Sequence, residues 1–320
     1  TYSEDFSNAS WVKLNATSTP NQGISPNGGN NAFKYFGATT NQDFRISVNV
    51  SNSYTYSIYV KAINSPYIRL RTIDGSCWFN MTTNAVATNT FASAEIKSVG
   101  NDWYRISVIS SSFTFSNNFY VHPHATDNTS TEMDGAEFLI WGAQVEELPY
   151  ATSYIPTNGA IATRLADSVT GAGDATTFNS TEGVLYAEMA ALADLTTQRW
   201  ISIGSGGNSN RVSVLFKTAT SVSCSVRASS SAVYDTNFNI GTTTNNVKVA
   251  IRYKSSDFSF FVNGVKVNSQ LSGALSFNSP LSELAFDSAD GGSNFFGKVK
   301  SLITFDTALT DAELECLTTI

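Results

Sequence analysis

Charged residues are scarce in this chain of 320 residues, in which Asp, Glu, Lys and Arg together make up 14% of the sequence. The formal net charge is -7. Because binding to nucleic-acid phosphates needs clustered Lys and Arg, we expect no nucleic-acid partner. No apolar run approaches the roughly 18 residues that a membrane-spanning helix requires, so we also expect no membrane insertion.

Cysteine and histidine are also rare, with three and two residues respectively. Cys77, Cys224 and Cys316 lie far apart, and an odd, dispersed count predicts neither a disulfide framework nor a structural zinc site built on a cysteine pair. We therefore expect buried free thiols, and a stability that depends on packing and oligomerisation. The residues after Thr1 do not resemble a signal peptide, which suggests a mature product or a fragment of a longer protein.

Aromatic residues are plentiful, at 12%, and so are Ser, Thr and Asn. In β-sandwiches, large side chains fill the pleats and small polar residues form the turns. Apolar and polar residues alternate over Tyr54–Lys61, Ile68–Thr72 and Trp103–Val108, which predicts strands with one buried face. Arg69 and Arg71 then share the face opposite the apolar side chains. The pattern predicts an all-β fold built from antiparallel sandwiches.

The chain is long enough for two domains, each with its own core. Residues 158–182 change character to glycines and small polar residues, which we interpret as a connection. The predicted domains are two consecutive sandwiches, residues 1–157 and residues 183–320.

Two local patterns in the second domain predict specific structures. Asn263-Gly264 lies between two strand-like runs and favours a two-residue type I′ hairpin turn. Thr310 and Glu313 form a capping-box pattern, which predicts a short C-terminal helix.

The join between the two predicted domains and four further short segments have a distinctive sequence. They are Trp141–Glu147 running on to Ala151–Thr157, then Trp103–Val108, Thr163–Asp167, Phe296–Lys300 and Phe305–Leu309. Together they resemble the distal parts of bacteriophage tail-fibre and structural proteins. In those proteins a jelly roll of the carbohydrate-binding-module type precedes a concanavalin A-like (laminin-G-like) lectin domain.

The resemblance implies a non-catalytic virion protein, namely the distal receptor-binding part of a tail fibre or spike that recognises bacterial surface glycan. Its partners would be bacterial surface polysaccharide and other virion subunits. It would be assembled in the bacterial cytoplasm and act on the extracellular virion, as a homo-oligomer and most simply a trimer. The chain has no heptads, so a trimer would form through sandwich surfaces or other segments.

Two other functions are compatible with the same folds. A structural or decoration protein would use the sandwiches to bind virion subunits and no sugar. A bacterial adhesin would share the folds, because fold alone does not fix function.

Sugar binding usually combines an aromatic face with hydrogen-bonding groups around it. The first domain offers Tyr67, Arg69, Arg71 and Trp78, and the second offers Trp200, Arg211 and Tyr234. The alternative role of each is packing against a neighbouring strand, domain or subunit.

An acidic motif suggests a polysaccharide hydrolase as a third function. Glu132, Asp134 and Glu137 have a spacing similar to that on the catalytic strand of jelly-roll glycoside hydrolases, in which two carboxylates flank the scissile bond. However, Gly135 disfavours a regular strand there, so the motif is also typical of a solvated acidic turn before the Phe138 strand.

Two segments have metal-ligand residue types. Asp287, Asp290 and Asn294 surround two glycines and could hold calcium, or form a plain turn. On a strand, the imidazoles of His122-Pro123-His124 would share a face and could chelate a metal, with Asp127 nearby. Because proline disfavours a strand interior and no full ligand set is evident, we interpret this segment as an ordinary loop. We predict no cofactor other than possible calcium.

Overall fold

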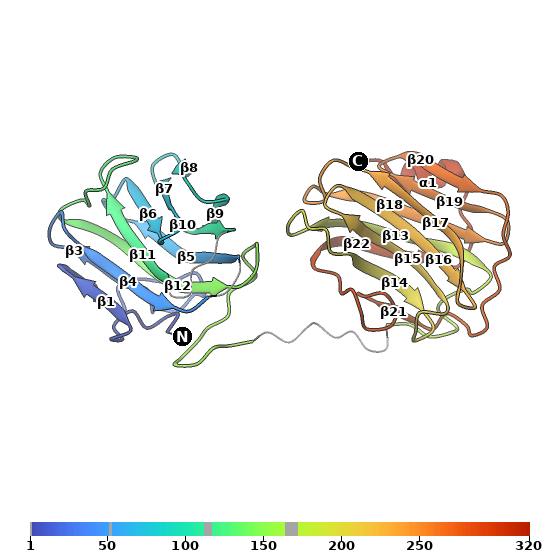
Figure 1. The fold of residues 1–320 in the computed structure, drawn as a ribbon, viewed down its shortest axis with the longest axis horizontal. Coiled ribbons are helices and arrows are strands. Elements are labelled where there is room, and N and C mark those ends of the chain that lie inside the picture. The colour runs from blue at the N-terminus through green and yellow to red at the C-terminus, as the bar shows by residue number, and fades with distance from the viewer. Residues whose placement is uncertain (1, 51–52, 112–116, 164–171) are drawn as a thin grey trace. The chain divides into compact units, whose positions relative to one another are not determined.

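The computed structural model describes residues 2–50, 53–111, 117–163 and 172–320, and it divides into two compact units, Thr1–Leu165 and Ala166–Ile320 (Figure 1). Each unit contains two antiparallel sheets, so the predicted all-β fold of two consecutive sandwiches is confirmed. Parts of the predicted connection pack on the units. Phe178 is buried in the second core, and Asn158 forms a β-bridge with Tyr2.

The first unit has two six-stranded sheets with one core between them. One sheet has the order β1-β4-β11-β6-β7-β8, with β1 Trp11–Leu14, β4 Asp43–Val48, β11 Asn117–His124, β6 Tyr67–Arg71, β7 Ser76–Asn80 and β8 Ala85–Asn89. The other has the order β2-β3-β12-β5-β10-β9, with β2 Ala16–Thr19, β3 Phe33–Gly37, β12 Ala136–Glu146, β5 Tyr54–Ala62, β10 Trp103–Ser110 and β9 Ser93–Gly100.

Strand β5 is buried on both faces. Tyr56, Ile58 and Val60 lie in the core between the sheets, as their alternation predicts. Thr55 on the opposite face is buried as well, and its hydroxyl donates to the Leu148 carbonyl at 2.6 Å. The prediction of a single buried face was therefore wrong for β5, because the chain after β12 folds back over the outer face.

The second unit has two five-stranded sheets. One has the order β20-β19-β18-β13-β22, with β20 Val265–Gln270, β19 Phe258–Val262, β18 Val247–Lys254, β13 Glu182–Ala191 and β22 Gly297–Phe305. The other has the order β17-β16-β15-β14-β21, with β17 Ser231–Asn239, β16 Ser221–Ala228, β15 Arg211–Thr218, β14 Arg199–Gly204 and β21 Glu283–Ala285.

The predicted hairpin turn joins β19 to β20. Asn263 and Gly264 have φ angles of 50° and 81°, and Val262 pairs with Val265 across the turn. Positive φ at both central residues matches the twist of a type I′ hairpin.

The predicted C-terminal helix is α1, Asp311–Thr318. Thr310 and Glu313 form the full capping box, and Leu314 is buried beside Tyr186 and Phe261 on the outer face of the β13–β18–β19 sheet. Among the described residues, no helix is long and apolar enough to cross a membrane.

Removing the Thr310 cap is expected to destabilise the second unit modestly. In a Thr310→Ala variant the Glu313 backbone N–H loses its side-chain acceptor, which typically costs about 1 kcal/mol. Urea unfolding of the full chain should show this decrease, and a Thr310→Ser variant should show little. An unchanged midpoint in the alanine variant would mean that α1 does not need its cap.

The three thiols are free, and their burial differs from the expectation at one position. Cys77 and Cys224 are buried, and burial raises the pKa of both. Cys316 is exposed because it lies on the side of α1 away from the buried Leu314.

Candidate functional site

Most of the polar residues predicted to bind sugar in the first domain lie on the outer face of the sheet that contains β6. Ile68 and Leu70 point into the core, so Arg69 and Arg71 share the opposite face, as the alternation predicts. The arginines nevertheless differ, because Arg69 is buried at 5% exposure and Arg71 is exposed.

Strand register places these residues in cross-strand rows. Arg69 lies between His122 on β11 and Trp78 on β7. Neighbouring side chains on one sheet face are close enough to interact directly. In the adjacent rows Arg71 lies between Tyr120 and Ser76, and Tyr67 lies between His124 and Asn80.

The segment His122-Pro123-His124 belongs to strand β11, so the prediction of an ordinary loop was wrong. Pro123 pairs with Ile68 on β6, but the pairing of β11 with β4 ends at Tyr120. Proline is tolerated there because β11 has a strand neighbour on one side only at that point. The Asp127 carboxylate, which the sequence placed near the histidines, bonds to another strand. It accepts hydrogen bonds from Thr88 at 3.2 and 2.9 Å.

Residues 125–135, here called the covering loop, connect β11 to β12 and contact this sheet face. The Thr129 carbonyl accepts a hydrogen bond from Arg69 Nη1 at 3.3 Å, and the Thr129 hydroxyl lies 3.0 Å from His124 Nδ1. The Met133 N–H donates to the Pro123 carbonyl at 3.0 Å. The loop therefore helps to bury Arg69, His122 and His124.

Trp78 is buried rather than exposed, at 6% exposure. The Arg69 guanidinium carbon lies 5.3 Å from its ring centroid, and the His124 ring packs against it at 6.0 Å with an interplanar angle of 70°. Trp78 consequently offers no open aromatic face for a sugar.

A shallow pocket of about 430 Å³ lies at the turn between β6 and β7. Of the four residues predicted in this domain, Arg71 and Trp78 line it, whereas Tyr67 and Arg69 do not. The full lining is Arg71, Thr72, Ile73, Asp74, Gly75, Ser76, Trp78, Thr90 and Asn128.

Tyr120 is a further residue of this face that the sequence reasoning missed. Arg71 lies over its ring at 4.8 Å and Arg45 lies over it at 5.7 Å, so the ring is flanked by two guanidinium groups. Arg45 is also ion-paired to Asp43. Tyr120 and His122 alternate with the core residues Phe119 and Val121. This alternation was the available signal, and Pro123 obscured it.

The cluster under the covering loop contains one ion pair and two neutral imidazoles at neutral pH. Burial lowers the pKa of His122 and of His124 to about 3, and the Arg69 guanidinium adds to both shifts. Burial lowers the pKa of Arg69 to about 10, so it stays charged. Its counter-charge is Glu132, whose Oε1 lies 3.4 Å from Arg69 Nη2.

The three carboxylates of the acidic motif have separate surroundings. Glu132 faces Arg69, Asp134 is exposed in the turn, and Glu137 on β12 pairs with Lys34 at 3.0 Å in the other sheet. A glycosidase needs two carboxyl groups that flank one bond. The arrangement therefore gives the hydrolase hypothesis no catalytic pair.

In the second unit Trp200 and Arg211 contact each other, and Tyr234 lies elsewhere. The Arg211 guanidinium is 4.3 Å from the Trp200 ring centroid and donates to the Ser288 carbonyl at 2.8 Å. Both residues are buried, at 8% and 6% exposure. Tyr234 points into the core on the opposite face, where its hydroxyl donates to Asn268 at 3.0 Å. The three residues do not form one site.

The carboxylates predicted to bind calcium accept hydrogen bonds from their own loop. Asp287 accepts from the Ala289 N–H at 2.6 Å, and Asp290 accepts from the Gly292 N–H at 3.2 Å and from Ser288. The Ser288 hydrogen bond is the main cause of the lowered pKa of Asp290. Asn294 is exposed. The calcium site stays a prediction.

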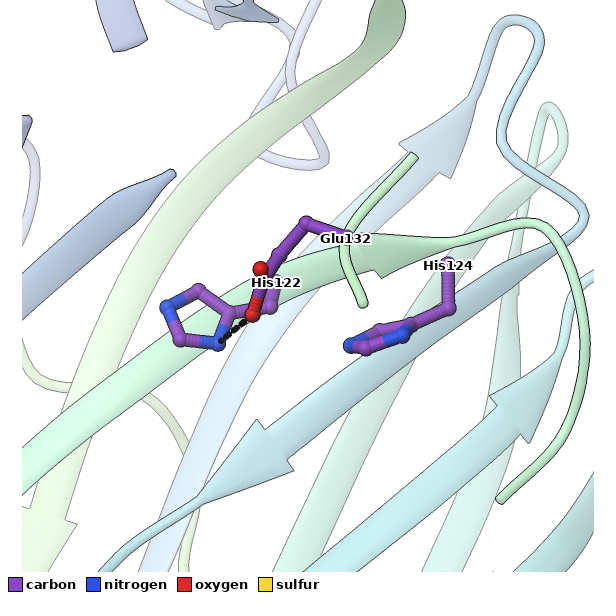
Figure 2. Close-up of side chains that lie close together, drawn as sticks. All are labelled: His122, His124 and Glu132. Carbon is purple, nitrogen blue, oxygen red and sulfur yellow. Dashed lines mark ion pairs between the residues drawn. The ribbon is translucent and has the colours of Figure 1, made fainter. Parts of the chain in front are cut away.

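His122, His124 and Glu132 bring metal-ligand types together in the first unit (Figure 2). One potential ligand atom from each lies within 4.8 Å of the others. The two histidines come from adjacent positions on one face of β11, and Glu132 reaches them from the covering loop.

No protein-family model matches this chain, and no curated protein matches it. Among solved structures it is similar to the CBM40 of the Ruminococcus gnavus IT-sialidase bound to α2,3-sialyllactose. The identity is 17% and the TM-score 0.40, over 47% of this chain and 92% of that chain. For the NanB sialidase of Streptococcus pneumoniae the identity is 12% and the TM-score 0.37, over 45% of this chain and 25% of that chain. The third similar structure is the binding domain of botulinum neurotoxin DC in complex with rat synaptotagmin II. Its identity is 12% and its TM-score 0.34, over 43% of this chain and 35% of that chain. Similarity at this level carries no argument about ligands, so function is argued from the residues of this chain.

Proposed function

We propose that the first unit binds a glycan without catalysing its cleavage, and that the binding site is the pocket at the β6–β7 turn. The observation that carries the proposal is an open, polar pocket with the exposed Arg71 guanidinium on one wall. A guanidinium presents a rigid fork of donors that suits neighbouring sugar hydroxyls.

The charge of the lining favours a neutral sugar. Arg71 contributes one positive charge and Asp74 one negative charge, and the Ser76 and Asn128 side chains can each donate and accept. Asp74 is held in place, since it accepts from the Tyr54 hydroxyl at 2.7 Å. The site therefore matches a hydroxyl-rich ring better than an anionic group.

Each site would bind weakly. Trp78 is buried and the Tyr120 ring is flanked by two arginines, so hydrogen bonds dominate over stacking. Several copies in one assembly would raise the apparent affinity through multivalency. This requirement supports an oligomer, and we retain the trimer of the sequence-based prediction as the simplest one.

The biological setting rests on the sequence resemblance alone. On that basis the glycan is a bacterial surface polysaccharide, and the protein is the receptor-binding part of a phage tail fibre or spike. The rival is a virion protein that binds other virion subunits and no sugar.

Replacing Arg71 tests the glycan site. We expect an Arg71→Ala variant of the full chain to bind roughly tenfold more weakly to its preferred polysaccharide, because a forked charged donor is worth about 1.4 kcal/mol or more. The measurement is an array of bacterial capsule, O-antigen and teichoic acid samples, followed by titration of the best binder.

A Lys97→Ala variant is the matched control, since Lys97 is an exposed cation on β9 in the other sheet of the same unit. It should bind like the parent protein. Equal binding by the Arg71 variant would exclude this pocket, and the absence of binding across the whole array would favour the structural role.

A further inference from the structure

The cluster of His122, His124 and Glu132 combines two ring nitrogens and a carboxylate in a buried place. His122 and His124 are 2% and 0% exposed, and the Glu132 side chain is 10% exposed. Two imidazoles with a carboxylate are a donor set typical of first-row transition metals, whereas calcium and magnesium prefer oxygen ligands alone.

A histidine ligates a metal ion through a ring nitrogen. His122 Nε2 and His124 Nε2 have no hydrogen-bond partner among the described residues, although both are buried. Buried polar atoms normally have a partner, so a ligand at His124 Nε2 would be favourable. His122 meets Glu132 through its other nitrogen, since Nδ1 lies 3.5 Å from Glu132 Oε1, whereas Nε2 lies 3.9 Å from Asp43 Oδ1.

Close by, three more buried polar atoms lack a partner in the described parts of the chain. They are Arg69 Nε, Trp78 Nε1 and Asp43 Oδ1, and the last lies 3.9 Å from His122 Nε2. The cluster therefore does not satisfy all of its buried polar groups internally.

Arg69 is the group that a metal ion must replace. Its Nη2 lies 3.0 Å from His122 Nδ1 and 3.4 Å from Glu132 Oε1, so it now supplies the positive charge for the carboxylate. A divalent cation would supply that charge instead and would repel the guanidinium. The Arg69 side chain therefore competes with the metal.

We propose that His122, His124 and Glu132 bind one divalent transition-metal ion of the zinc type. The ion would tie the covering loop to strand β11. Metal bonds of about 2.0–2.1 Å require ligand atoms roughly 3.4 Å apart, so the three groups must approach by up to about 1.5 Å on binding. Glu132 Oε1 already lies 3.5 Å from His122 Nδ1, so the remaining movement concerns the contacts with His124.

The site adjoins the proposed glycan pocket. His124 packs against Trp78, and Asn128 of the covering loop also lines the pocket. Metal binding would therefore stabilise one wall of that pocket. The metal site does not rest on the glycan proposal, since it is measured without any sugar.

The test is a titration of the full chain, without a histidine tag and after treatment with EDTA, with zinc chloride followed by calorimetry at pH 7.5. We expect one ion per chain. His124→Gln and Glu132→Gln should each weaken binding at least tenfold. Asp134→Asn, which removes an exposed carboxylate from the same loop, should leave the affinity unchanged. Cobalt(II) should give the visible absorption of a nitrogen- and oxygen-ligated ion.

An Arg69→Met variant keeps the test decisive if the other variants fold poorly, because the expected result for it is a higher affinity for zinc. Removing the competing cation should tighten zinc binding at least tenfold, and circular dichroism would verify the fold of each variant. No saturable zinc binding by the parent chain would overturn the proposal. So would equal affinity in the Glu132→Gln variant, or no gain in the Arg69→Met variant.

Discussion

Lowering the pH from 7 to 5 is expected to destabilise the first unit by a few kcal/mol in metal-free solution, with little effect of this kind on the second unit. The folded-state pKa of His122 and His124 is about 3, against 6.5 for an ordinary histidine. Between these values the unfolded chain binds more protons, so stability is fully present above pH 6.5 and is lost as the pH falls. The slope is at most about 1.4 kcal/mol per pH unit for each histidine.

Burial is the largest cause of both lowered pKa values, and the net effect of the neighbouring charges adds to it. Arg69, Arg71 and Arg45 all disfavour a charged His122, and Glu132 favours it but does not offset burial. The two histidines of the chain both lie in the first unit, so the second unit is an internal control.

Hydrogen exchange mass spectrometry along a urea series, with EDTA present, resolves the two units in the same chain. A His124→Gln variant should reduce the pH slope of the first unit by about half. Parallel pH dependence of the two units would contradict the neutral, buried state of these rings.

Replacing Arg252 is expected to cost the second unit about 2 kcal/mol. This is less than the loss for a fully buried ion pair, because the Asp257 and Asp311 side chains are 35% and 41% exposed. Arg252 on β18 is 9% exposed. It donates to Asp311 at 2.8 Å, to Asp257 at 2.7 Å and to the Leu309 carbonyl at 3.0 Å. It thereby joins the sheet to the start of α1, so an Arg252→Met variant should also release the helix.

The measurement is urea unfolding of the full chain, with exchange of the α1 peptide as the local readout. Lys254→Met is the control, because Lys254 on the same strand pairs with Glu182 at 2.8 Å but is half exposed. It should leave the unfolding midpoint within error. A comparable loss in both variants would show that burial of the Arg252 network does not matter.

The sequence predicted most of the local structure correctly. Alternation located β6 and β10, Asn263-Gly264 predicted the type I′ turn, and Thr310 predicted the start of α1. These features depend on neighbours within a few residues, so short patterns contain the necessary information.

The candidate site was predicted only in part. Alternation placed Arg69 and Arg71 on one outer face, but it could not show that Arg69 would be buried and Arg71 exposed. That difference depends on a loop some sixty residues away, whose Thr129 carbonyl contacts Arg69. The same loop brings Glu132 to His122, a contact that no spacing in the sequence indicates.

The sequence by itself determined the all-β class and the two sandwiches. For strands such as β6 and β10 it also determined the side on which a residue lies, because this follows from the two-residue period of extended chain. Only the tertiary structure decided which outer faces are covered and which polar groups meet under the cover. It left Arg71 at an open pocket and enclosed His122, His124 and Glu132 with Arg69. The reason is physical: burial and charge pairing are set by which distant segment packs on a face, and that is a property of the whole fold.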